Sequence, residues 1–298
     1  MLPHVSTPRF LTLPPGVTPT RIETPRGTFA ALEALPGSGI AERGPALLVP
    51  GLTGSKEDFI AVLQTLAQSG RRIVAIDLKG QYETPGPDDR GAYACGELGA
   101  DIDVLAGVIG DGEPVHLVGH SFGGLVTRAA VIDGTHRFAS YTMMATGPVG
   151  ITGRRAKGGR KILEEATDLG LEHLWQTRFE PEALASGVSD DIMAFLRKRM
   201  LANSPTALAA MAEQCLEIDD RTEELQEAGV PMLVLFGEHD DGWAPELQAA
   251  TAERLEADCV VVPGAVHSPA VEAPETTASA LVRFWNTAET LDQKSNKV

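Results

Sequence analysis

The pentapeptide Gly119–His–Ser–Phe–Gly123 is the part of this chain whose residue types point most directly to chemistry. It follows the apolar run Val115–Val118 and precedes Phe122–Ile132, which has helical spacing. A serine at such a strand-to-helix turn has a strained backbone, and residues without a Cβ on either side let the two backbone arms pass closely. The free N–H groups and positive dipole end of the helix favour negative charge beside Ser121. The pattern therefore predicts a nucleophilic serine.

A serine hydroxyl is a weak nucleophile near neutral pH, so it needs a base whose orientation is set by an acceptor. Two later loops offer both groups. Asp240 follows the apolar run Met232–Phe236, and His267 follows Cys259–Val262. Ligands of open parallel sheets bind beyond the carboxyl ends of the strands, and these loops begin at such ends. We therefore expect the serine, acid and histidine, in that chain order, to meet at one edge of a sheet.

The elements that must position these residues alternate between strands and helices, which predicts an α/β fold with a mostly parallel sheet flanked by helices. We expect strands at Thr28–Leu35, Ala46–Pro50, Arg72–Asp77, Val115–Gly119, Phe138–Ala145, Met232–Phe236 and Cys259–Val262. We expect helices at Ser55–Ser69, Glu97–Ile109, Phe122–Ile132 and Pro245–Leu255, and a final helix from Ser268 or Ala273 to Trp285.

Between residues 147 and 228 this alternation stops, and the pattern becomes that of several amphipathic helices. The segment is interpreted as an inserted helical cap within a core formed by residues 1–146 and 229–298. Its basic cluster contains Arg154, Arg155, Lys157, Arg160 and Lys161. Such a cluster is typical of a solvated helix face, with attraction of an anionic substrate as the alternative.

Composition limits the possible partners. The 298 residues are 43% hydrophobic and 22% charged, as in a globular protein with a substantial core, and the formal net charge is −16. This charge argues against nucleic acid or an anionic membrane surface as a partner. No window approaches the roughly 20 apolar residues of a membrane helix, and the N-terminus lacks the pattern of a secretory signal. Three widely spaced cysteines fit reduced thiols, so we expect a cytoplasmic protein.

With these motifs in order, the chain resembles an α/β-hydrolase, an esterase- or lipase-like enzyme with a helical cap after the sixth strand. The likeness extends from about residue 20 to 286. It implies that Ser121 is the nucleophile, His267 the general base and acid, and Asp240 the carboxylate that orients the imidazole. It also implies that no metal or organic cofactor takes part.

The resemblance further implies that the backbone N–H groups of Leu52 and Phe122 stabilise the oxyanion. Here the chain departs from the common His-Gly of the family, because Pro50 precedes Gly51. The donor is a backbone group, so the oxyanion hole should survive with different support. We expect substrate contacts from four residues, namely Gly51, Trp175, Phe179 and Trp243.

Two adjacent residues, Asp240 and Asp241, are candidates for the acid. Its distance from Gly237, at the strand end, favours Asp240, whereas counting back from Pro245 favours Asp241. Among the other histidines, His120 is expected to serve local packing.

The sequence therefore predicts a hydrolase acting on a small ester or related acyl compound through an acyl-enzyme intermediate. A cofactor-free perhydrolase, an aminopeptidase or a C–C bond hydrolase would use the same triad. The non-enzymatic alternative is a ligand-binding protein on the same fold.

Overall fold

Eight strands form one sheet in the computed structural model, which describes residues 6–37, 39, 41–135 and 138–295, without the side chains of residue 154 and residues 291–295. The strands are β1 (Val17–Thr24), β2 (Gly27–Ala34), β3 (Arg43–Val49), β4 (Arg71–Ile76), β5 (Val115–His120), β6 (Phe138–Met144), β7 (Met232–Gly237) and β8 (Asp258–Val262). Their spatial order is β1-β2-β4-β3-β5-β6-β7-β8. From β4 to β8 every neighbouring pair is parallel, whereas β2 is antiparallel to both β1 and β4.

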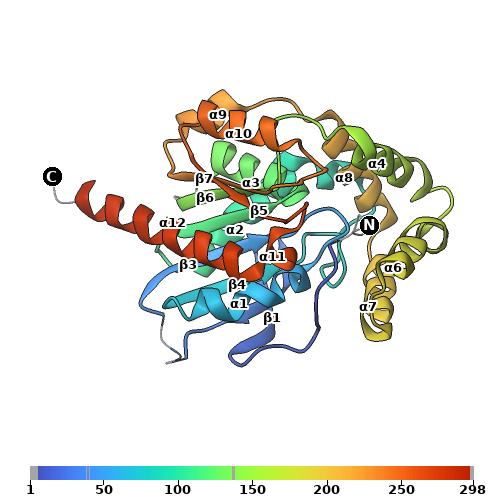
Figure 1. The fold of residues 1–298 in the computed structure, drawn as a ribbon, viewed down its shortest axis with the longest axis horizontal. Coiled ribbons are helices and arrows are strands. Elements are labelled where there is room, and N and C mark those ends of the chain that lie inside the picture. The colour runs from blue at the N-terminus through green and yellow to red at the C-terminus, as the bar shows by residue number, and fades with distance from the viewer. Residues whose placement is uncertain (1–5, 38, 40, 136–137, 296–298) are drawn as a thin grey trace.

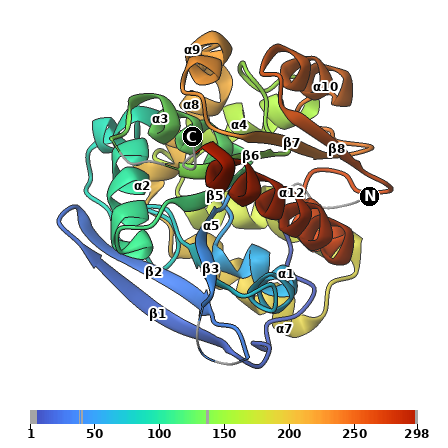
Figure 2. The ribbon, with the colours of Figure 1, turned by 90° about the vertical axis from the view of Figure 1, so that its left-hand side faces the viewer.

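Helices cover both faces of this sheet (Figures 1 and 2). One face carries α2 (Cys95–Gly110), α3 (Phe122–Asp133) and α10 (Pro245–Arg254), and the other carries α1 (Ile60–Ala67), α11 (Pro269–Glu272) and α12 (Pro274–Ser295). Short 3₁₀ helices span Lys56–Phe59 and Arg90–Tyr93. Because the central strands are buried on both faces, they read as continuous apolar runs, as in β7, where all six residues are buried.

The predicted fold class is confirmed: the sheet is mostly parallel and flanked by helices. The edge strand β1 was not predicted. Only Val17 and Ile22 of its eight residues are buried, so the strand lacks a strong apolar signal, and it pairs along its whole length with β2. The predicted final helix is two helices, α11 and α12, which meet at Pro274 because proline is well tolerated in the first turn of a helix and poorly inside one.

In the described structure, residues 147–228 contain helices and turns and no strand. The helices are α4 (Gly153–Glu165), α5 (Leu171–Leu174), α6 (Glu180–Ser186), α7 (Asp190–Leu201), α8 (Pro205–Glu217) and α9 (Thr222–Glu227), with one π-helical turn, η3, at Trp175–Phe179. Helices α4 to α8 gather at one end of the molecule, on the right of Figure 1. Buried apolar side chains of α4 to α8 form a separate cluster among themselves. None of the helices that the structure describes is long and apolar enough to cross a membrane.

Candidate active site

Ser121 lies at the turn between β5 and α3 with φ 54° and ψ −121°, a conformation that L-residues rarely adopt. The two flanking glycines are required by close approach of the backbone. A Cβ added at Gly119 would lie 2.1 Å from the Thr127 hydroxyl, and one at Gly123 would lie 2.4 Å from the Pro50 carbonyl oxygen. The turn therefore holds the serine at the carboxyl end of the central strand and at the start of a helix, as the pentapeptide predicted.

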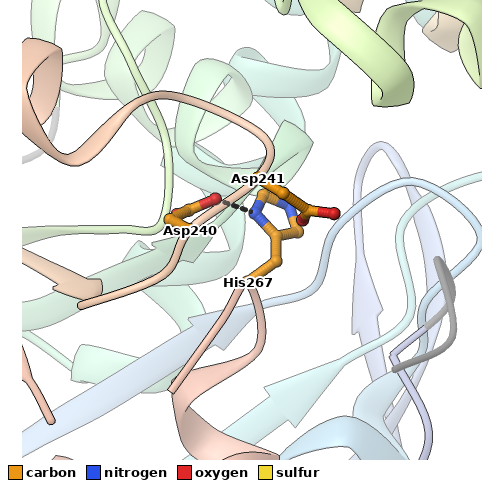
Figure 3. Close-up of side chains that lie close together, drawn as sticks. All are labelled: Asp240, Asp241 and His267. Carbon is orange, nitrogen blue, oxygen red and sulfur yellow. Dashed lines mark hydrogen bonds and ion pairs between the residues drawn. The ribbon is translucent and has the colours of Figure 1, made fainter. Parts of the chain in front are cut away.

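The structure brings His267 between Ser121 and Asp240. The Nε2 atom of His267 lies 2.9 Å from Ser121 Oγ, and its Nδ1 atom lies 2.8 Å from Asp240 Oδ1. Figure 3 shows the carboxylate of Asp240 directed at the imidazole, and that of Asp241 pointing away from Asp240. The three residues come from loops after β5, β7 and β8, whose carboxyl ends meet at this edge of the sheet. Their geometry is that of a nucleophile, a base and an orienting acid.

Asp241 is engaged elsewhere. Its carboxylate accepts a hydrogen bond from Arg155 Nε at 2.5 Å. One ligand atom from each of Asp240, Asp241 and His267 lies within 4.8 Å of the others, a grouping that could hold a cation. In the described structure, however, His267 Nδ1 is bonded to Asp240 and Asp241 to Arg155, so protein partners already occupy these atoms.

The electrostatics of Asp240 determine the proton arrangement on the histidine. Burial raises the pKa of Asp240, but the nearby His267 and hydrogen bonds from His267, Gln248 and the Gly242 N–H outweigh burial, so the pKa lies below its usual 3.8. The carboxylate is therefore anionic at neutral pH and accepts the Nδ1–H of His267. In the tautomer with its proton on Nδ1, the Nε2 atom is the acceptor that faces the Ser121 hydroxyl.

Gln248 is a residue of this site that the sequence analysis missed. Its Nε2 donates to Asp240 Oδ2 at 2.9 Å and to the Trp243 carbonyl oxygen at 2.8 Å, and its side chain is fully buried on α10. The amide therefore fixes the second carboxylate oxygen, while the Gly242 N–H, at 2.8 Å, fixes the first. A glutamine in the first turn of the predicted helix Pro245–Leu255, just after the loop that contains Asp240, is the sequence signal that could have identified it.

His120 does more than pack locally. Its Nε2 lies 2.7 Å from the backbone carbonyl oxygen of His267, and because a carbonyl only accepts, Nε2 carries the proton. Burial, and then the neighbouring His267, lower the pKa of His120 to about 3, so the ring is neutral near pH 7. The residue before Ser121 is thus hydrogen-bonded to the loop that carries His267.

The loop after β3 approaches Ser121 closely. A Cβ added at Gly51 would lie 3.0 Å from Ser121 Cβ, so only glycine allows this approach without displacement. Leu52, the next residue, lines the cavity beside Ser121. Phe122 opens α3, where first-turn N–H groups lack partners within the helix.

A cavity of about 80 Å³ lies against Ser121 and His267. Its apolar wall includes Leu52, Ile151 and Ile162, and the predicted substrate contacts Gly51 and Phe179 also line it. A larger open groove of about 860 Å³ lies between α1 and α12, but its described lining contains no histidine, cysteine or carboxylate. The chemistry-bearing residues therefore converge on the smaller cavity.

Two other expected substrate contacts lie outside the described lining of this cavity. Trp243 is buried, with its ring 6.2 Å from that of His267 and its Nε1 donating to the Val149 carbonyl oxygen. Trp175 is buried in the apolar cluster of the helical segment, and Leu174 is fully buried there as well. Both tryptophans serve packing because their rings fill interior space.

The basic residues of α4 are partly exposed to solvent and partly in the wall of the cavity. Lys157, Arg160 and Lys161 are exposed, as expected for a solvated face, whereas Arg155 lines the cavity. The side chain of Arg154 lies outside the described part of the structure.

Comparison with known proteins extends these observations. Residues 46–280 match the alpha/beta hydrolase family. Over 245 residues, or 80% of this chain, the sequence is 27% identical to the dihydrolipoyllysine-residue acetyltransferase component of the acetoin cleaving system of Pseudomonas putida. This match spans 63% of that relative's length. A second relative is RutD of Variovorax paradoxus, which is 32% identical over 106 residues. That match covers 36% of this chain and 39% of RutD.

Solved structures share the fold. A thermophilic esterase from Thermogutta terrifontis superimposes with a TM-score of 0.72 at 23% identity, covering 91% of this chain and 99% of the esterase. The enol-lactonase of Burkholderia xenovorans LB400 also gives a TM-score of 0.72, at 17% identity, covering 90% of this chain and 100% of the lactonase.

Proposed function

Because this chain belongs to the alpha/beta hydrolase family, we propose that it is a serine hydrolase that cleaves a small ester or related acyl bond, with Ser121, His267 and Asp240 as its catalytic triad. The observation that carries the proposal is the position of His267, whose two ring nitrogens lie within hydrogen-bond distance of Ser121 Oγ and Asp240 Oδ1. A carboxylesterase is the simplest enzyme with this constellation.

The reaction proceeds in two halves. His267 Nε2 takes the hydroxyl proton as Ser121 Oγ attacks the carbonyl carbon, and the carbonyl electron pair moves to oxygen. When the tetrahedral intermediate collapses, the bond to the alcohol oxygen breaks and His267 returns the proton to the departing alcohol. Water then attacks the acyl carbon while His267 Nε2 takes its proton. The bond from the acyl carbon to Ser121 Oγ breaks, His267 returns the proton to Oγ, and the carboxylic acid product leaves. Asp240 remains anionic throughout and stabilises the imidazolium.

The oxyanion that forms in each half needs two N–H donors that converge on one point. We assign these donors to the backbones of Leu52 and Phe122. The close approach of Gly51 to Ser121 supports this assignment, as does the place of Phe122 at the start of α3. The positive end of the α3 dipole adds to the stabilisation.

The helical residues 147–228 form a cap in this proposal, over a core of residues 1–146 and 229–298. Ile151, Arg155, Phe179 and Cys215, all from this segment, line the cavity above Ser121. Drug-sized ligands occupy pockets of roughly 300–1,000 Å³. A cavity of about 80 Å³ therefore favours short acyl groups.

All three cysteines are free, in keeping with the cytoplasmic location proposed from the sequence.

A fluorophosphonate probe tests the proposal. An activated serine is phosphonylated, so the parent protein should be labelled at Ser121, and it should hydrolyse 4-nitrophenyl acetate. Ser121→Ala should abolish labelling and lower turnover by several orders of magnitude, with the melting temperature kept near that of the parent because the hydroxyl is catalytic. A parent that binds small esters without labelling or turnover would be a ligand-binding protein, and an alanine variant of equal activity would also refute the triad.

A further inference from the structure

Charged side chains line one part of the cavity beside Ser121. Two of them are the guanidinium groups of Arg155 and Arg178, and the one carboxylate in its described lining belongs to Asp58. Asp58 is paired with Arg199, whose Nη1 lies 2.7 Å from Asp58 Oδ1, and both side chains are buried. The charge of Asp58 is therefore already balanced by a cation other than the two that face the cavity.

Arg155 is balanced in a similar way. It comes from α4, and its Nε lies 2.5 Å from Asp241 Oδ1. This pair stands directly beside the proposed acid, Asp240. The third guanidinium of this comparison, that of Arg178 on η3, also lines the cavity but forms no ion pair with the described residues.

The surroundings of Arg178 hold it in place without neutralising it. Its side chain lies against α4 at Gly158, where an added Cβ would fall 1.9 Å from Arg178 Nη2, and its guanidinium carbon lies 5.4 Å from the centre of the Phe179 ring. Within the described structure no ion pair to Arg178 is present, and its buried Nε has no hydrogen-bond partner. Burial, and to a smaller extent the charge of Arg155, lower the pKa of Arg178, and the charges of Glu182 and Glu165 offset this effect only in part.

A partly buried guanidinium without an ion-pair partner is costly, because the neighbouring carboxylates repay only part of its desolvation. The planar fork of an arginine matches the two oxygens of a carboxylate. We propose that Arg178 binds a carboxylate of the substrate, so that the enzyme hydrolyses short esters that carry a second, ionised carboxyl group. This inference rests on the proposed serine hydrolase activity, because the same small cavity holds Ser121 and Arg178.

Two pairs of esters test the inference. In the first, methyl hydrogen succinate and methyl succinamate differ only by a carboxylate or a neutral amide on the acyl part. In the second, acetoxyacetate and acetoxyacetamide differ in the same way on the alcohol part. The parent should show a kcat/KM at least tenfold higher for the carboxylate ester of one pair, measured by acid release in a pH-stat. Fluorophosphonate labelling at Ser121 is recorded on the same samples.

Arg178→Gln should lower that ratio of kcat/KM about tenfold or more, since a charge-assisted hydrogen bond is lost. Intrinsic differences between the two esters cancel when variants are compared. Arg178→Lys keeps the positive charge but lacks the planar guanidinium, so it should retain part of the preference for the carboxylate ester. This second variant also keeps the inference testable if Arg178→Gln does not fold. Arg160→Gln removes the same charge from the exposed face of α4 and should leave the ratio unchanged.

The outcomes separate the inference from the function on which it rests. A parent that is labelled at Ser121 but prefers the carboxylate ester in neither pair overturns the inference and leaves the serine hydrolase intact. An equal loss of preference in Arg160→Gln would assign the effect to general charge and would overturn it as well. A parent that is neither labelled nor active refutes the proposed function itself.

Discussion

At the scale of single residues, the site depends on how firmly His267 is held. Asp240 binds its Nδ1, His120 binds its backbone carbonyl oxygen, and Gln248 and the Gly242 N–H hold Asp240 in turn. These groups come from three parts of the chain: the end of β5, the loop after β7 and helix α10. A catalytic histidine must be held in one orientation and in the correct tautomer. We therefore expect Asp240, which contacts His267, to contribute more to kcat than the neighbouring carboxylate of Asp241.

Asp240→Asn should therefore lower kcat about 10⁴-fold, because an amide no longer fixes the tautomer of His267. Asp241→Asn is the matched control, since the same change at the next residue alters a carboxylate that is bonded to Arg155. Its effect on kcat should be far smaller. Steady-state kinetics on 4-nitrophenyl acetate compare the two, and a larger loss in Asp241→Asn would transfer the role of the acid to that residue.

At the scale of elements, the helical segment α4 to α8 contributes both a cavity wall and a packed interior. The two functions fall on neighbouring positions of one short stretch. Phe179 belongs to the apolar cluster of the segment and also lines the cavity, whereas Leu174 is fully buried in that cluster and is absent from the described cavity lining. Substitutions at these two large apolar residues can thus be distinguished by whether they change substrate specificity.

Phe179→Ala should enlarge the cavity and raise kcat/KM for 4-nitrophenyl butyrate relative to the acetate. Leu174→Ala should lower the free energy of unfolding by about 2–5 kcal/mol, as is typical of a leucine truncated in a core, without changing this ratio. Kinetics on both esters and urea denaturation distinguish the two results. If Phe179→Ala keeps the parental ratio, the acyl group is bounded by another part of the wall.

At the scale of the whole molecule, one acidic residue ties the C-terminal helix to the sheet. Glu289 on α12 accepts hydrogen bonds from Arg71 of β4 at 2.7 Å and from His116 of β5 at 3.2 Å. Burial raises the pKa of Glu289, but the contacts with His116 and Arg71 outweigh it and lower the pKa to about 2 from 4.5. The helix that covers one face of the sheet is therefore anchored by a charge.

Because the pKa of Glu289 is lower in the folded chain, its stabilising effect is complete above pH 4.5 and is lost as the pH falls toward 2. Glu289→Gln should lower the free energy of unfolding by about 2 kcal/mol at pH 7, and the difference from the parent should shrink between pH 4.5 and 2. Glu213→Gln, in an exposed pair with Arg90, should have little effect. Urea denaturation at several pH values checks this, and a difference that grows toward acid would contradict it.

Much of the fold could be predicted from local patterns. The apolar runs that became β5 and β7 are short and continuous because these strands are buried on both faces, and the elbow at Ser121 follows from glycines that backbone packing requires. Turn chemistry and periodicity act over a few residues, so they can be recognised without the rest of the chain. The edge strand β1 was not predicted because a half-exposed strand lacks such an apolar run. Its strand conformation is stabilised by pairing with β2, which the pattern of its own residues does not indicate.

The sequence by itself determined the order of Ser121, an acid and His267 at the ends of three strands, and the helical nature of residues 147–228. Tertiary structure alone decided that Asp240 rather than Asp241 faces the imidazole, and that Arg178 reaches the cavity. The physical reason is that a side chain's partners come from segments far apart in the chain. Their meeting is set by the packing of whole elements, which no local pattern encodes.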